Sequence, residues 1–354
     1  MELIQPEVEA ARDWVLHVDL DQFLAAVEVL RHPELAGRPV VVGGDGNPRR
    51  PRQVVATASY EARAFGVRSG MPLGLAARKC PDAVFLPSDK PAYEAASVRV
   101  METLRTFSVV VEVWGWDEAF VGAHTTDPEA LAADMRARLR EVTHLSCAIG
   151  IGETRLQAKT ATGFAKPAGI ARLTRAAWIE TMGPKPVSAL WGIGSRTAER
   201  LAELGILTVE SLARADPDVL ARAFGPTIGP SLKILGLGGD ESPIDGTPYV
   251  ARSRGKEVTF ERDLTARAGI EAHIVQLATE VTESVVAEGR RVTHVAVKVR
   301  RPSFFTRTKI HKLPEPTIDA LVVARTALEL FDRFEPDRAV RLLGVRVVLE
   351  MPRA

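Results

Sequence analysis

The sequence predicts a multidomain α+β protein, with a mixed α/β domain first, a small helical unit second and a four-stranded, two-helix domain last. Three observations support this prediction. The chain has 354 residues, which is more than one ordinary domain needs. Short apolar strands alternate with helical segments up to about residue 180, as is typical of a mixed α/β domain. Short Ala-rich helical segments interrupted by glycines then follow, and strand and helix patterns return near residue 256.

The first domain is expected to contain short buried strands, because brief apolar runs end at Gly, Pro or acidic residues. Strands are predicted over residues 14–18, 39–42, 54–59, 109–113, 119–122 and 146–152. Helices are predicted over residues 23–30, 59–65, 91–107, 128–142 and 155–165. The helix at 59–65 has the clearest limits, since Ser59 is a good N-cap and Gly66 a good stop. Together these elements predict a split sheet covered by helices.

The rest of the chain is expected to form two further units joined by a linker. Glycines interrupt the short predicted helices of residues 186–239. Residues 240–255 are rich in Gly, Ser, Pro and Arg and have no periodicity, as is typical of a linker. In the last domain, strands are predicted over residues 256–260, 293–301, 304–312 and 340–349, and helices over 268–288 and 317–334. This order predicts a two-layer α+β domain.

The composition is that of an ordinary soluble protein. Apolar residues make up 46% and charged residues 26% of the chain, which argues against a disordered or fibrous protein. Cys80 and Cys147 are too few for a disulfide framework or a four-ligand zinc site and are expected to be buried thiols. Residues 1–13 lack a basic leader, and no apolar run approaches the roughly 20 residues that span a bilayer. We therefore expect a cytoplasmic monomer without a membrane partner.

The charges are unevenly distributed, although the formal net charge is only +1. Residues 250–354 contain 19 Lys and Arg against 14 Asp and Glu, so they carry +5 and the first 249 residues carry −4. Residues 290–312 contain eight basic and no acidic residues. Such a concentration suits nucleic-acid phosphates. Strand alternation predicts that one basic sheet face is formed by Lys298, Arg300, Arg307 and Lys309.

Two pairs of carboxylates follow buried strands of the first domain. Asp19 and Asp21 flank Leu20 at the end of one strand, and residues two apart in a strand point to the same face. Asp117 and Glu118 form the second pair, after another apolar run. Converging carboxylates repel one another unless a cation lies between them, and their oxygens suit Mg²⁺. The alternative, which the spacing leaves open, is that each pair belongs to a turn or a helix cap.

Four side chains are candidates for binding phosphate. Tyr60 and Arg63 lie three residues apart on one face of a predicted helix, and the N-terminus of a helix favours an anion. The planar guanidinium and the hydroxyl group both suit phosphate oxygens. Lys159 and Lys166 lie seven residues apart, on or just after another helix, so they also share a face. The alternative for all four is a solvated helix surface.

A glycine-rich connection at residues 192–197 joins two helical segments. Gly192 and Gly194 would expose backbone N–H groups and a helix N-terminus at this connection. Such a hairpin can hold one phosphate of a nucleic-acid backbone without reading the sequence. The alternative is a packing corner between two helices.

Residues 17–28 resemble the opening motif of the Y-family DNA polymerases. Further motifs of this family are matched in the same order along the chain. They are a finger motif at residues 56–72, carboxylate motifs at 116–119 and 148–169, a thumb hairpin at 190–212, and parts of a C-terminal DNA-binding domain at 313–317 and 341–345. The likeness covers essentially the whole chain and is greatest to the DinB, or DNA polymerase IV, branch.

The resemblance implies the right-hand arrangement of this family. The implied domains are a palm at residues 1–21 and 86–183, fingers at 22–85, a thumb at 184–239, a linker at 240–255 and a little finger at 256–354. The resemblance also implies a translesion DNA polymerase that adds nucleotides to a primer 3′-hydroxyl by two-metal phosphoryl transfer. Low fidelity and no proofreading are expected. The implied partners are primer–template DNA and dNTPs.

Individual residues receive roles from the same resemblance. Two Mg²⁺ ions, for which Mn²⁺ is expected to substitute, would be held by Asp19, Asp117, Glu118 and the carbonyl group of Leu20. The incoming triphosphate would be held by Thr57, Tyr60, Arg63 and Lys166, with Lys159 as a further candidate. DNA would be bound by Gly192, Gly194, Lys298, Arg300, Arg307 and Lys309.

The chain departs from the family pattern at the expected sugar gate, Phe23 and Leu24. The family usually has an aromatic residue at position 24, so the shorter Leu24 predicts weak discrimination against ribonucleotides and makes rNTPs expected substrates. The alternative is that a neighbouring residue or the backbone closes the space. The small residues Val54, Ala56 and Gly70 predict a roomy cover over the nascent base pair, and hence lesion bypass.

Other functions are less consistent with the sequence. A DNA-binding accessory protein of the same family that has lost catalysis would lack a metal-binding carboxylate, and all three are present. A transferase of this fold that adds chiefly one nucleotide usually has extra N-terminal domains. A nucleotide cyclase-like palm enzyme would not account for the thumb hairpin and the basic C-terminal domain. Residues 345–354 do not contain the Gln- and Leu-containing peptide of many bacterial relatives, so binding to a sliding clamp is not predicted.

Overall fold

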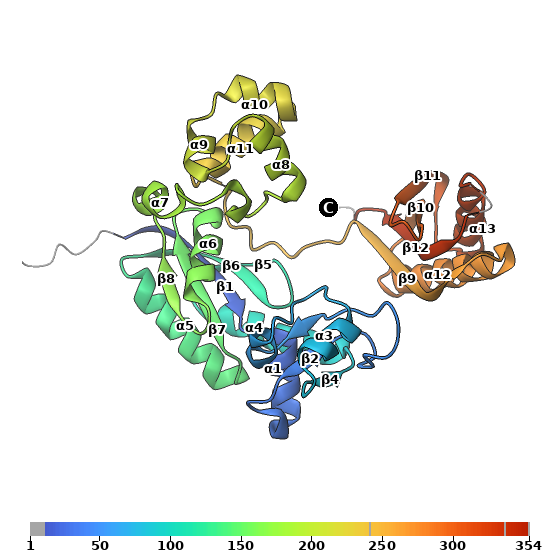
Figure 1. The fold of residues 1–354 in the computed structure, drawn as a ribbon, viewed down its shortest axis with the longest axis horizontal. Coiled ribbons are helices and arrows are strands. Elements are labelled where there is room, and N and C mark those ends of the chain that lie inside the picture. The colour runs from blue at the N-terminus through green and yellow to red at the C-terminus, as the bar shows by residue number, and fades with distance from the viewer. Residues whose placement is uncertain (1–10, 241, 336–337, 353–354) are drawn as a thin grey trace, which may run out of the picture. The chain divides into compact units, whose positions relative to one another are not determined.

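The computed structural model describes residues 11–240, 242–335 and 338–352 (Figure 1). The first ten residues of the expected palm, residue 241 of the expected linker, and residues 336–337 and 353–354 of the expected little finger lie outside the described residues. The chain divides into two compact units. The first contains residues 1–47, 54–71 and 75–248, and the second contains residues 48–53, 72–74 and 249–354.

A five-stranded sheet with the order β5-β6-β1-β7-β8 forms the centre of the first unit. Its strands are β1 (Arg12–Leu20), β5 (Val110–Val113), β6 (Glu118–Thr125), β7 (Cys147–Gly152) and β8 (Ile170–Arg172). β1 is antiparallel to both β6 and β7. β5 is antiparallel to β6, and β7 is parallel to β8. β1 is therefore the central strand, and the end of β1 lies between two neighbouring strands.

Helices cover both faces of this sheet. Against the face that carries Leu16, Val18 and Leu20, the helices α4 (Lys90–Leu104) and α5 (Pro128–Thr143) pack their buried apolar residues. α6 (Arg155–Ala165) packs on the opposite face, where Gly150 of β7 has no side chain. A Cβ at Gly150 would lie 2.0 Å from the carbonyl oxygen of Ala158 in α6. Glycine at this position therefore allows α6 to approach the sheet.

A small three-stranded sheet, with the order β3-β2-β4, lies within the expected fingers. Its strands are β2 (Val40–Val42), β3 (Thr57–Ala58) and β4 (Val84–Leu86), and the surrounding helices are α1 (Phe23–Arg31), the short 3-10 helix η1 (Pro33–Leu35), α2 (Tyr60–Ala64) and α3 (Leu73–Lys79). Ser59 caps α2 as predicted, because its hydroxyl oxygen accepts a hydrogen bond from the backbone N–H of Ala62 at 3.3 Å. The cap makes Tyr60 the first residue of the helix.

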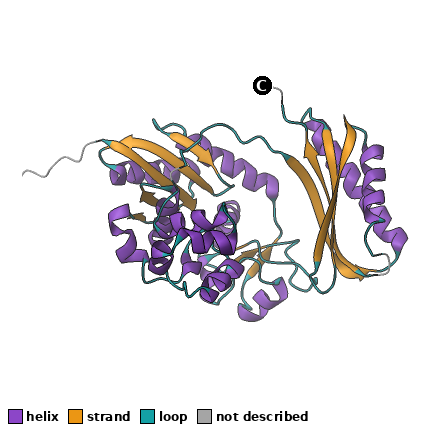
Figure 2. Ribbon diagram, turned by 90° about the horizontal axis from the view of Figure 1, so that it is seen from above, coloured by secondary structure: helices purple, strands orange, loops and turns teal. Residues whose placement is uncertain are grey.

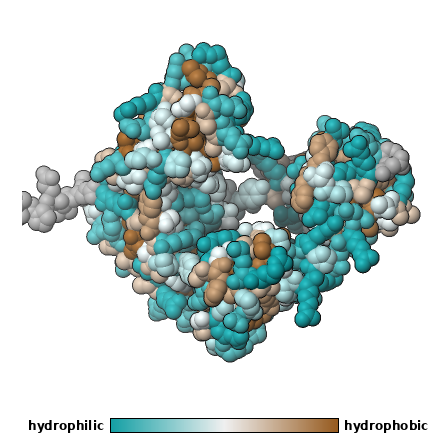
Figure 3. All heavy atoms as spheres, viewed as in Figure 1, coloured by the Kyte–Doolittle hydropathy of each residue, from teal (hydrophilic) through white to brown (hydrophobic). Residues whose placement is uncertain are grey.

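The remainder of the first unit is helical. Its elements are α7 (Arg175–Met182), the 3-10 helix η2 (Val187–Ala189), α8 (Ser195–Glu203), α9 (Val209–Arg214), α10 (Pro217–Phe224) and α11 (Ile228–Gly236). Trp178 lies in their core, and its indole N–H donates to the carbonyl oxygen of Gly236 at 2.8 Å. Figure 3 shows hydrophobic side chains on the surface of this part, where Leu207 and Ile228 are 60% and 57% exposed. Among the described helices, none combines the length and apolar character that crossing a bilayer requires.

The second unit is the predicted two-layer α+β domain. Its strands β9 (Ser253–Leu264), β10 (Val292–Arg300), β11 (Thr306–Thr317) and β12 (Val340–Leu349) form an antiparallel sheet with the order β11-β10-β12-β9. The helices α12 (Arg267–Ala287) and α13 (Ala320–Phe331) lie along one side of it (Figure 2). Residues 242–252 form neither helix nor strand, as expected of a linker, but β9 begins at Ser253 rather than at residue 256.

The strand register corrects the expectation of one basic face formed by Lys298, Arg300, Arg307 and Lys309. Arg307 pairs with Val299, and Lys309 pairs with Val297, in the antiparallel ladder. Directly paired residues share a face, so Arg307 and Lys309 lie on the side that the helices cover. Lys298 and Arg300 lie on the open side. The expectation of a single face is wrong because alternation within each strand leaves the register between the strands undetermined.

Candidate active site

Two carboxylates lie side by side where β1 ends and β6 begins. Asp19 pairs directly with Glu118 in the antiparallel ladder, so the two side chains share a face. Asp117 is adjacent, because its carbonyl oxygen accepts a hydrogen bond from the backbone N–H of Leu20 at 2.9 Å. The pairing of two strands therefore brings together all four residues that the sequence predicts at a metal site.

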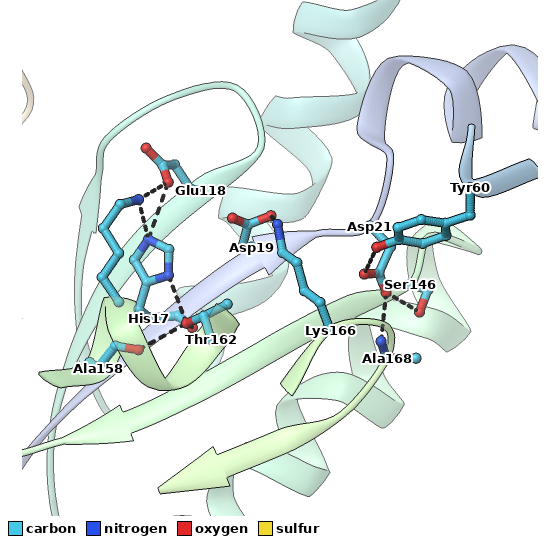
Figure 4. A network of polar contacts seen from close by, with 11 residues as sticks. His17, Asp19, Asp21, Tyr60, Glu118, Ser146, Ala158, Thr162, Lys166 and Ala168 are labelled. Atoms are coloured by element: carbon cyan, nitrogen blue, oxygen red, sulfur yellow. Dashed lines mark hydrogen bonds and ion pairs between the residues drawn. The ribbon is translucent and has the colours of Figure 1, made fainter. Parts of the chain in front are cut away.

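Two lysines already neutralise part of this negative charge. Lys166 forms an ion pair with Asp19 (Figure 4), in which Nζ lies 2.5 Å from Oδ1, and Lys159 forms an ion pair with Glu118. The two lysines, expected on one helix face, thus contact different carboxylates. α6 ends at Ala165, and Lys166 has an extended backbone with ψ of 138°, so helical spacing no longer applies to Lys166.

The pKa values of Asp117 and Glu118 are shifted in opposite directions. Hydrogen bonding to His17, with a further contribution from Lys159, lowers the pKa of Glu118 to about 2. Partial burial of the carboxyl group and the nearby charge of Asp19 raise the pKa of Asp117 above its usual value. Of these two carboxylates, Asp117 is therefore the one whose ionised form an added cation would stabilise more.

His17 is a site residue that the sequence analysis did not single out. Its ring is 1% exposed, its Nε2 lies 3.2 Å from Glu118 Oε2, and its Nδ1 lies 2.9 Å from Thr162 Oγ1 of α6. Burial lowers the pKa of His17. His17 precedes Asp19 by two residues in β1, so strand alternation was the signal that could have found it.

Asp21 does not join the cluster of carboxylates. β1 ends at Leu20, and Gln22 has a left-handed backbone with φ of 44°, so the two-residue alternation that paired Asp21 with Asp19 stops at this point. The carboxylate of Asp21 accepts a hydrogen bond from the Tyr60 hydroxyl at 2.6 Å (Figure 4). The expectation that Asp19 and Asp21 share a face around a cation is therefore wrong.

The candidates for phosphate binding in the expected fingers lie around the start of α2. Tyr60 and Arg63 share a helix face as predicted, since the guanidinium carbon of Arg63 lies 5.0 Å from the centre of the Tyr60 ring. Arg63 is also tied to the preceding strand, because its Nε donates to the carbonyl oxygen of Ala58 at 2.9 Å. Thr57 is the first residue of that strand, β3. The single hydroxyl proton of Tyr60 is donated to Asp21, so the Arg63 guanidinium group is the part of α2 best suited to an anion.

The two expected gate residues have different environments. Phe23 is 2% exposed and belongs to the hydrophobic core of the first unit, so its ring is unavailable to a bound sugar. Leu24 is partly buried and packs against the edge of the same core. Both residues lie in the first turn of α1, directly after the strand end that carries Asp19. Leu24 is therefore the better-placed candidate of the two, and a gate role for either residue stays a prediction.

The residues expected to cover the base pair lie on two neighbouring loop segments. The backbone N–H of Gly70 donates to the carbonyl oxygen of Val55 at 2.8 Å, which places Gly70 beside Val54 and Ala56. Val54 is 47% exposed, and Ala56 and Gly70 are also exposed. Gly70 has φ of +81°, and a Cβ there would meet no atom within 4 Å. This surface is therefore made of small, solvent-facing groups.

The glycine-rich connection has the predicted hairpin form. Gly192 has φ of +94°, and Gly194 is the N-cap of the nine-residue helix α8. Both glycines are exposed, whereas Ile193 between them is 6% exposed and anchors the turn in the helical core. The turn therefore offers backbone groups to solvent while its centre is fixed.

The oxygen donors at the end of β1 fit divalent magnesium. Three carboxylates and one backbone carbonyl group form a hard-oxygen set of the kind that Mg²⁺ prefers. The raised pKa of Asp117 reflects its partial burial and the like charge of Asp19, and a cation would offset both. Within residues 11–240, 242–335 and 338–352, no three acidic, His or Cys side chains form a ready-made metal centre, and Lys166 and Lys159 instead engage two of the carboxylates.

Comparisons with known proteins agree with this site. The model of the impB/mucB/samB family matches residues 18–163, the model of its C-terminal domain matches residues 251–348, and the IMS family HHH motif matches residues 175–206. The chain is 52% identical over 343 residues to DNA polymerase IV 2 of Mycobacterium tuberculosis, with 96% of this chain and 99% of that protein covered. It is 38% identical over 337 residues to DNA polymerase IV of Methanoculleus marisnigri, with 94% and 93% covered.

A solved structure agrees over the same length. The Y-family DNA polymerase chimera Dbh-Dpo4(243-245)-Dbh superposes with a TM-score of 0.83 at 26% sequence identity, and the match covers 95% of this chain and 98% of the chimera. The sequence matches span the strand ends that carry the carboxylates, the hairpin and the C-terminal sheet. The chain therefore belongs to the impB/mucB/samB family and, within it, to the DNA polymerase IV group of the Y-family DNA polymerases.

Proposed function

We propose that this protein is a template-directed DNA polymerase of the translesion type, which adds nucleotides to a primer 3′-hydroxyl group. The observation that carries the proposal is the direct pairing of Asp19 with Glu118, which places three carboxylates at one strand end in a chain 52% identical to a DNA polymerase IV. A catalytically inactive accessory protein is not supported, because no carboxylate of this set is missing. Primer–template DNA and nucleoside triphosphates are the corresponding partners.

The metal-binding residues would be Asp19, Asp117, Glu118 and the Leu20 carbonyl group, and two Mg²⁺ ions are the expected occupants. Bound divalent ions supply activation of the primer hydroxyl and neutralisation of the charge on the transferred phosphoryl group. The protein contributes a fixed spacing, because its carboxylates are placed by strand pairing.

Tyr60, Arg63 and Lys166 are proposed to form the triphosphate site, in which Arg63 and Lys166 contact phosphate and Tyr60, whose hydroxyl donates to Asp21, positions α2. Tyr60 and Arg63 share one face of α2, and Lys166 lies against Asp19 at the end of β1. A phosphate oxygen can replace the Asp19 carboxylate as the partner of the Lys166 ammonium when a cation takes over Asp19. Thr57 remains a candidate at the start of β3. Lys159 contacts Glu118 and His17, so a role beside the carboxylates suits it better than a contact with phosphate.

Two substrate properties follow from the small residues of the site. Leu24 is the proposed sugar gate, and its partial burial at the edge of the core limits how far it can project toward a ribose. Weak discrimination against ribonucleotides is the expected result. The exposed surface formed by Val54, Ala56 and Gly70 suits a distorted template base, so bypass of lesions and low fidelity are expected.

Primer extension tests the proposed function directly. The wild-type protein with Mg²⁺ should extend a labelled primer on undamaged and lesion-containing templates, and Asp117→Ala should not. A matched control is Asp134→Ala, because Asp134 is an exposed carboxylate of α5. Failure of the wild-type protein to extend a primer with either Mg²⁺ or Mn²⁺ would rule out the proposed polymerase activity.

A further inference from the structure

Asp21 is a buried carboxylate at the junction of three chain segments. Its residue is 5% exposed. Oδ1 accepts a hydrogen bond from the Tyr60 hydroxyl at 2.6 Å. Oδ2 accepts from the Ser146 hydroxyl and from the backbone N–H of Ala168, each at 2.9 Å (Figure 4). A buried carboxylate with three donors is well satisfied, and it fixes the groups that donate to it.

The segments that Asp21 joins are those that carry the proposed phosphate-binding groups. Tyr60 begins α2, and Ala168 follows Lys166 by two residues. The residue after Asp21 strengthens the first connection, because Gln22 Oε1 accepts from the backbone N–H of Tyr60 at 2.5 Å. The turn after β1 therefore holds the first residue of α2 by both its side chain and its backbone.

The second connection fixes the turn that carries Lys166. Ala168 has a left-handed backbone with φ of 51°, which a residue other than glycine adopts only when its surroundings hold it there. The hydrogen bond from its N–H to Asp21 supplies such a constraint, and Ser146 braces the same oxygen atom. The backbone N–H of Asp21 in turn donates to the carbonyl oxygen of Ser146 at 2.9 Å, which holds Asp21 itself.

We propose that Asp21 is a positioning residue for the nucleotide triphosphate, which holds Tyr60 of the fingers and the Lys166 turn of the palm at a set spacing. This inference rests on the proposed function, in which Arg63 of α2 and Lys166 bind phosphate, while the single hydroxyl proton of Tyr60 is donated to Asp21. Asp21 has no place in the metal cluster, so its effect is on the binding of the nucleotide. Groups that are fixed before the ligand arrives lose less entropy on binding, and loss of Asp21 should therefore weaken the affinity for nucleotide.

The test compares Asp21→Asn with the wild type in single-nucleotide insertion. Asparagine has the shape of aspartate but only one acceptor oxygen. It therefore cannot accept hydrogen bonds both from Tyr60 and from the Ser146 and Ala168 donors. The KM for dNTP should rise about tenfold, the size expected for losing a charge-assisted hydrogen bond, while kcat changes less than about threefold. The Kd of dNTP for a complex with a dideoxy-terminated primer should rise by the same factor. The Kd for primer–template DNA should stay near the wild-type value, and the melting temperature should fall only slightly, because one buried donor loses its acceptor.

Further variants separate positioning from folding. Ser146→Ala removes one donor and leaves Asp21 in place, so a rise in KM of about two- to threefold is expected. In the Asp21→Asn background, Tyr60→Phe should add little, because Tyr60 has already lost its anchor, and this non-additive result is the signature of one unit. Asp134→Asn, which changes an exposed carboxylate of α5, should change neither the KM nor the Kd for dNTP.

The outcomes distinguish this inference from the proposed function. If Arg63→Ala and Lys166→Ala raise KM but Asp21→Asn does not, the triphosphate site stands and positioning by Asp21 is wrong. A general loss of melting temperature and DNA affinity in both Asp21→Asn and Ser146→Ala would show a purely structural role and overturn the inference. If none of the four substitutions changes the affinity for nucleotide, the proposed triphosphate site itself is wrong.

Discussion

Lys166 Nζ lies 2.5 Å from Oδ1 of Asp19, so a proposed phosphate-binding ammonium is paired with a proposed metal-binding carboxylate. The pair balances charge at the end of β1 without a ligand. Asp117, for which burial and the charge of Asp19 raise the pKa, is the less compensated member of the cluster. Binding of Mg²⁺ and nucleotide would exchange these internal partners for external ones. On the proposed function, the two kinds of ligand would therefore be coupled through one ion pair.

Lys166→Ala should impair nucleotide binding and leave Asp19 without its partner. We expect the KM for dNTP to rise about tenfold or more, because a charge-assisted contact to phosphate is lost. Steady-state insertion kinetics measure this change. Lys90→Ala is the matched control, since Lys90 is an exposed residue at the start of α4. An equal KM for dNTP in the two variants would contradict a phosphate-binding role for Lys166.

Neutralising Asp117 and neutralising Glu118 should change the melting temperature in opposite directions. Without metal at neutral pH, Asp117→Asn should raise the melting temperature, because its raised pKa marks a charge that costs stability. Glu118→Gln should lower the melting temperature, because the hydrogen bond with His17 and the contact with Lys159 are lost. Both variants should be inactive in primer extension.

The pH dependence of these two effects follows from the direction of each pKa shift. The stability from Glu118 is present above its ordinary pKa of 4.5 and is lost as the pH falls toward about 2. The cost from Asp117 is present above its raised pKa and is gone below its ordinary value of 3.8. Calorimetry of the metal-free variants across this range measures both. An Asp117→Asn variant less stable than the wild type at neutral pH would contradict the assignment.

Gly150→Ala should destabilise the first unit. The added Cβ would lie 2.0 Å from the carbonyl oxygen of Ala158, so α6 must move away from β7, at a cost of about 3 kcal/mol in the free energy of unfolding. Gly163→Ala is the control in the same helix, because a Cβ at Gly163 would meet no atom within 4 Å. Helix propensity predicts that it stabilises by about 1 kcal/mol. Urea unfolding of both variants measures the contrast, and similar curves would contradict the packing described.

Leu24→Phe should increase discrimination against ribonucleotides. A planar ring at this position of α1 reaches farther than leucine and should oppose a ribose 2′-hydroxyl. We expect the ratio of kcat/KM for dNTP to that for rNTP to rise about tenfold or more. Leu30→Phe, an exposed position near the other end of α1, is the control. An unchanged ratio that is already high in the wild type would show that another group closes the gate.

The two sides of the C-terminal sheet should contribute unequally to DNA binding. Reversing the charge of Lys298 and Arg300, on the open side, should weaken duplex binding and reduce the slope of log K against log salt by about 2, one unit for each lost phosphate contact. Reversing Arg307 and Lys309, on the side of the helices, should have a smaller effect. Fluorescence anisotropy over a series of salt concentrations compares the pairs. A larger effect of the second pair would contradict the use of the open side.

Several of the longer elements were predictable from their period, although the helices α3 and α7 were missed. The strand at residues 340–349 and the helix at 155–165 have the predicted limits, and α12 differs from its prediction by one residue at each end. The three-residue strands β4 and β8 were missed, because three residues show no alternation, and β2, of the same length, was predicted only from its unbroken run of valines. β11 extends to Thr317, where a helix was expected to begin. Strand pairing with β10 decided that boundary, and pairing is a tertiary effect that local pattern does not contain.

The candidate site was predictable in its composition but only partly in its contacts. The spacing of motifs identified Asp19, Asp117 and Glu118, which strand pairing does bring together. The environment of Asp21 could not be predicted, because it depends on where β1 stops and on a turn 147 residues farther along, at Ala168. Lys159 was expected with the phosphate groups, and its position on α6 places it against Glu118 instead. Register and chain crossings are long-range properties, so one sequence does not fix them.

The spacing of Asp19 and Glu118 is set by the hydrogen-bond ladder of the central strand of the sheet. Central strands are usually the last part of a domain to exchange their amide protons, because they open only when the whole domain unfolds. Slow hydrogen–deuterium exchange is therefore expected at Val18 and Phe120, and faster exchange in the short helix α2 that carries Tyr60. Fluctuations of the fingers would then change how a nucleotide is held while the distance between the carboxylates stays constant. The metal-binding carboxylates would then be as rigid as the core, whereas the residues that select the substrate would move with the surface.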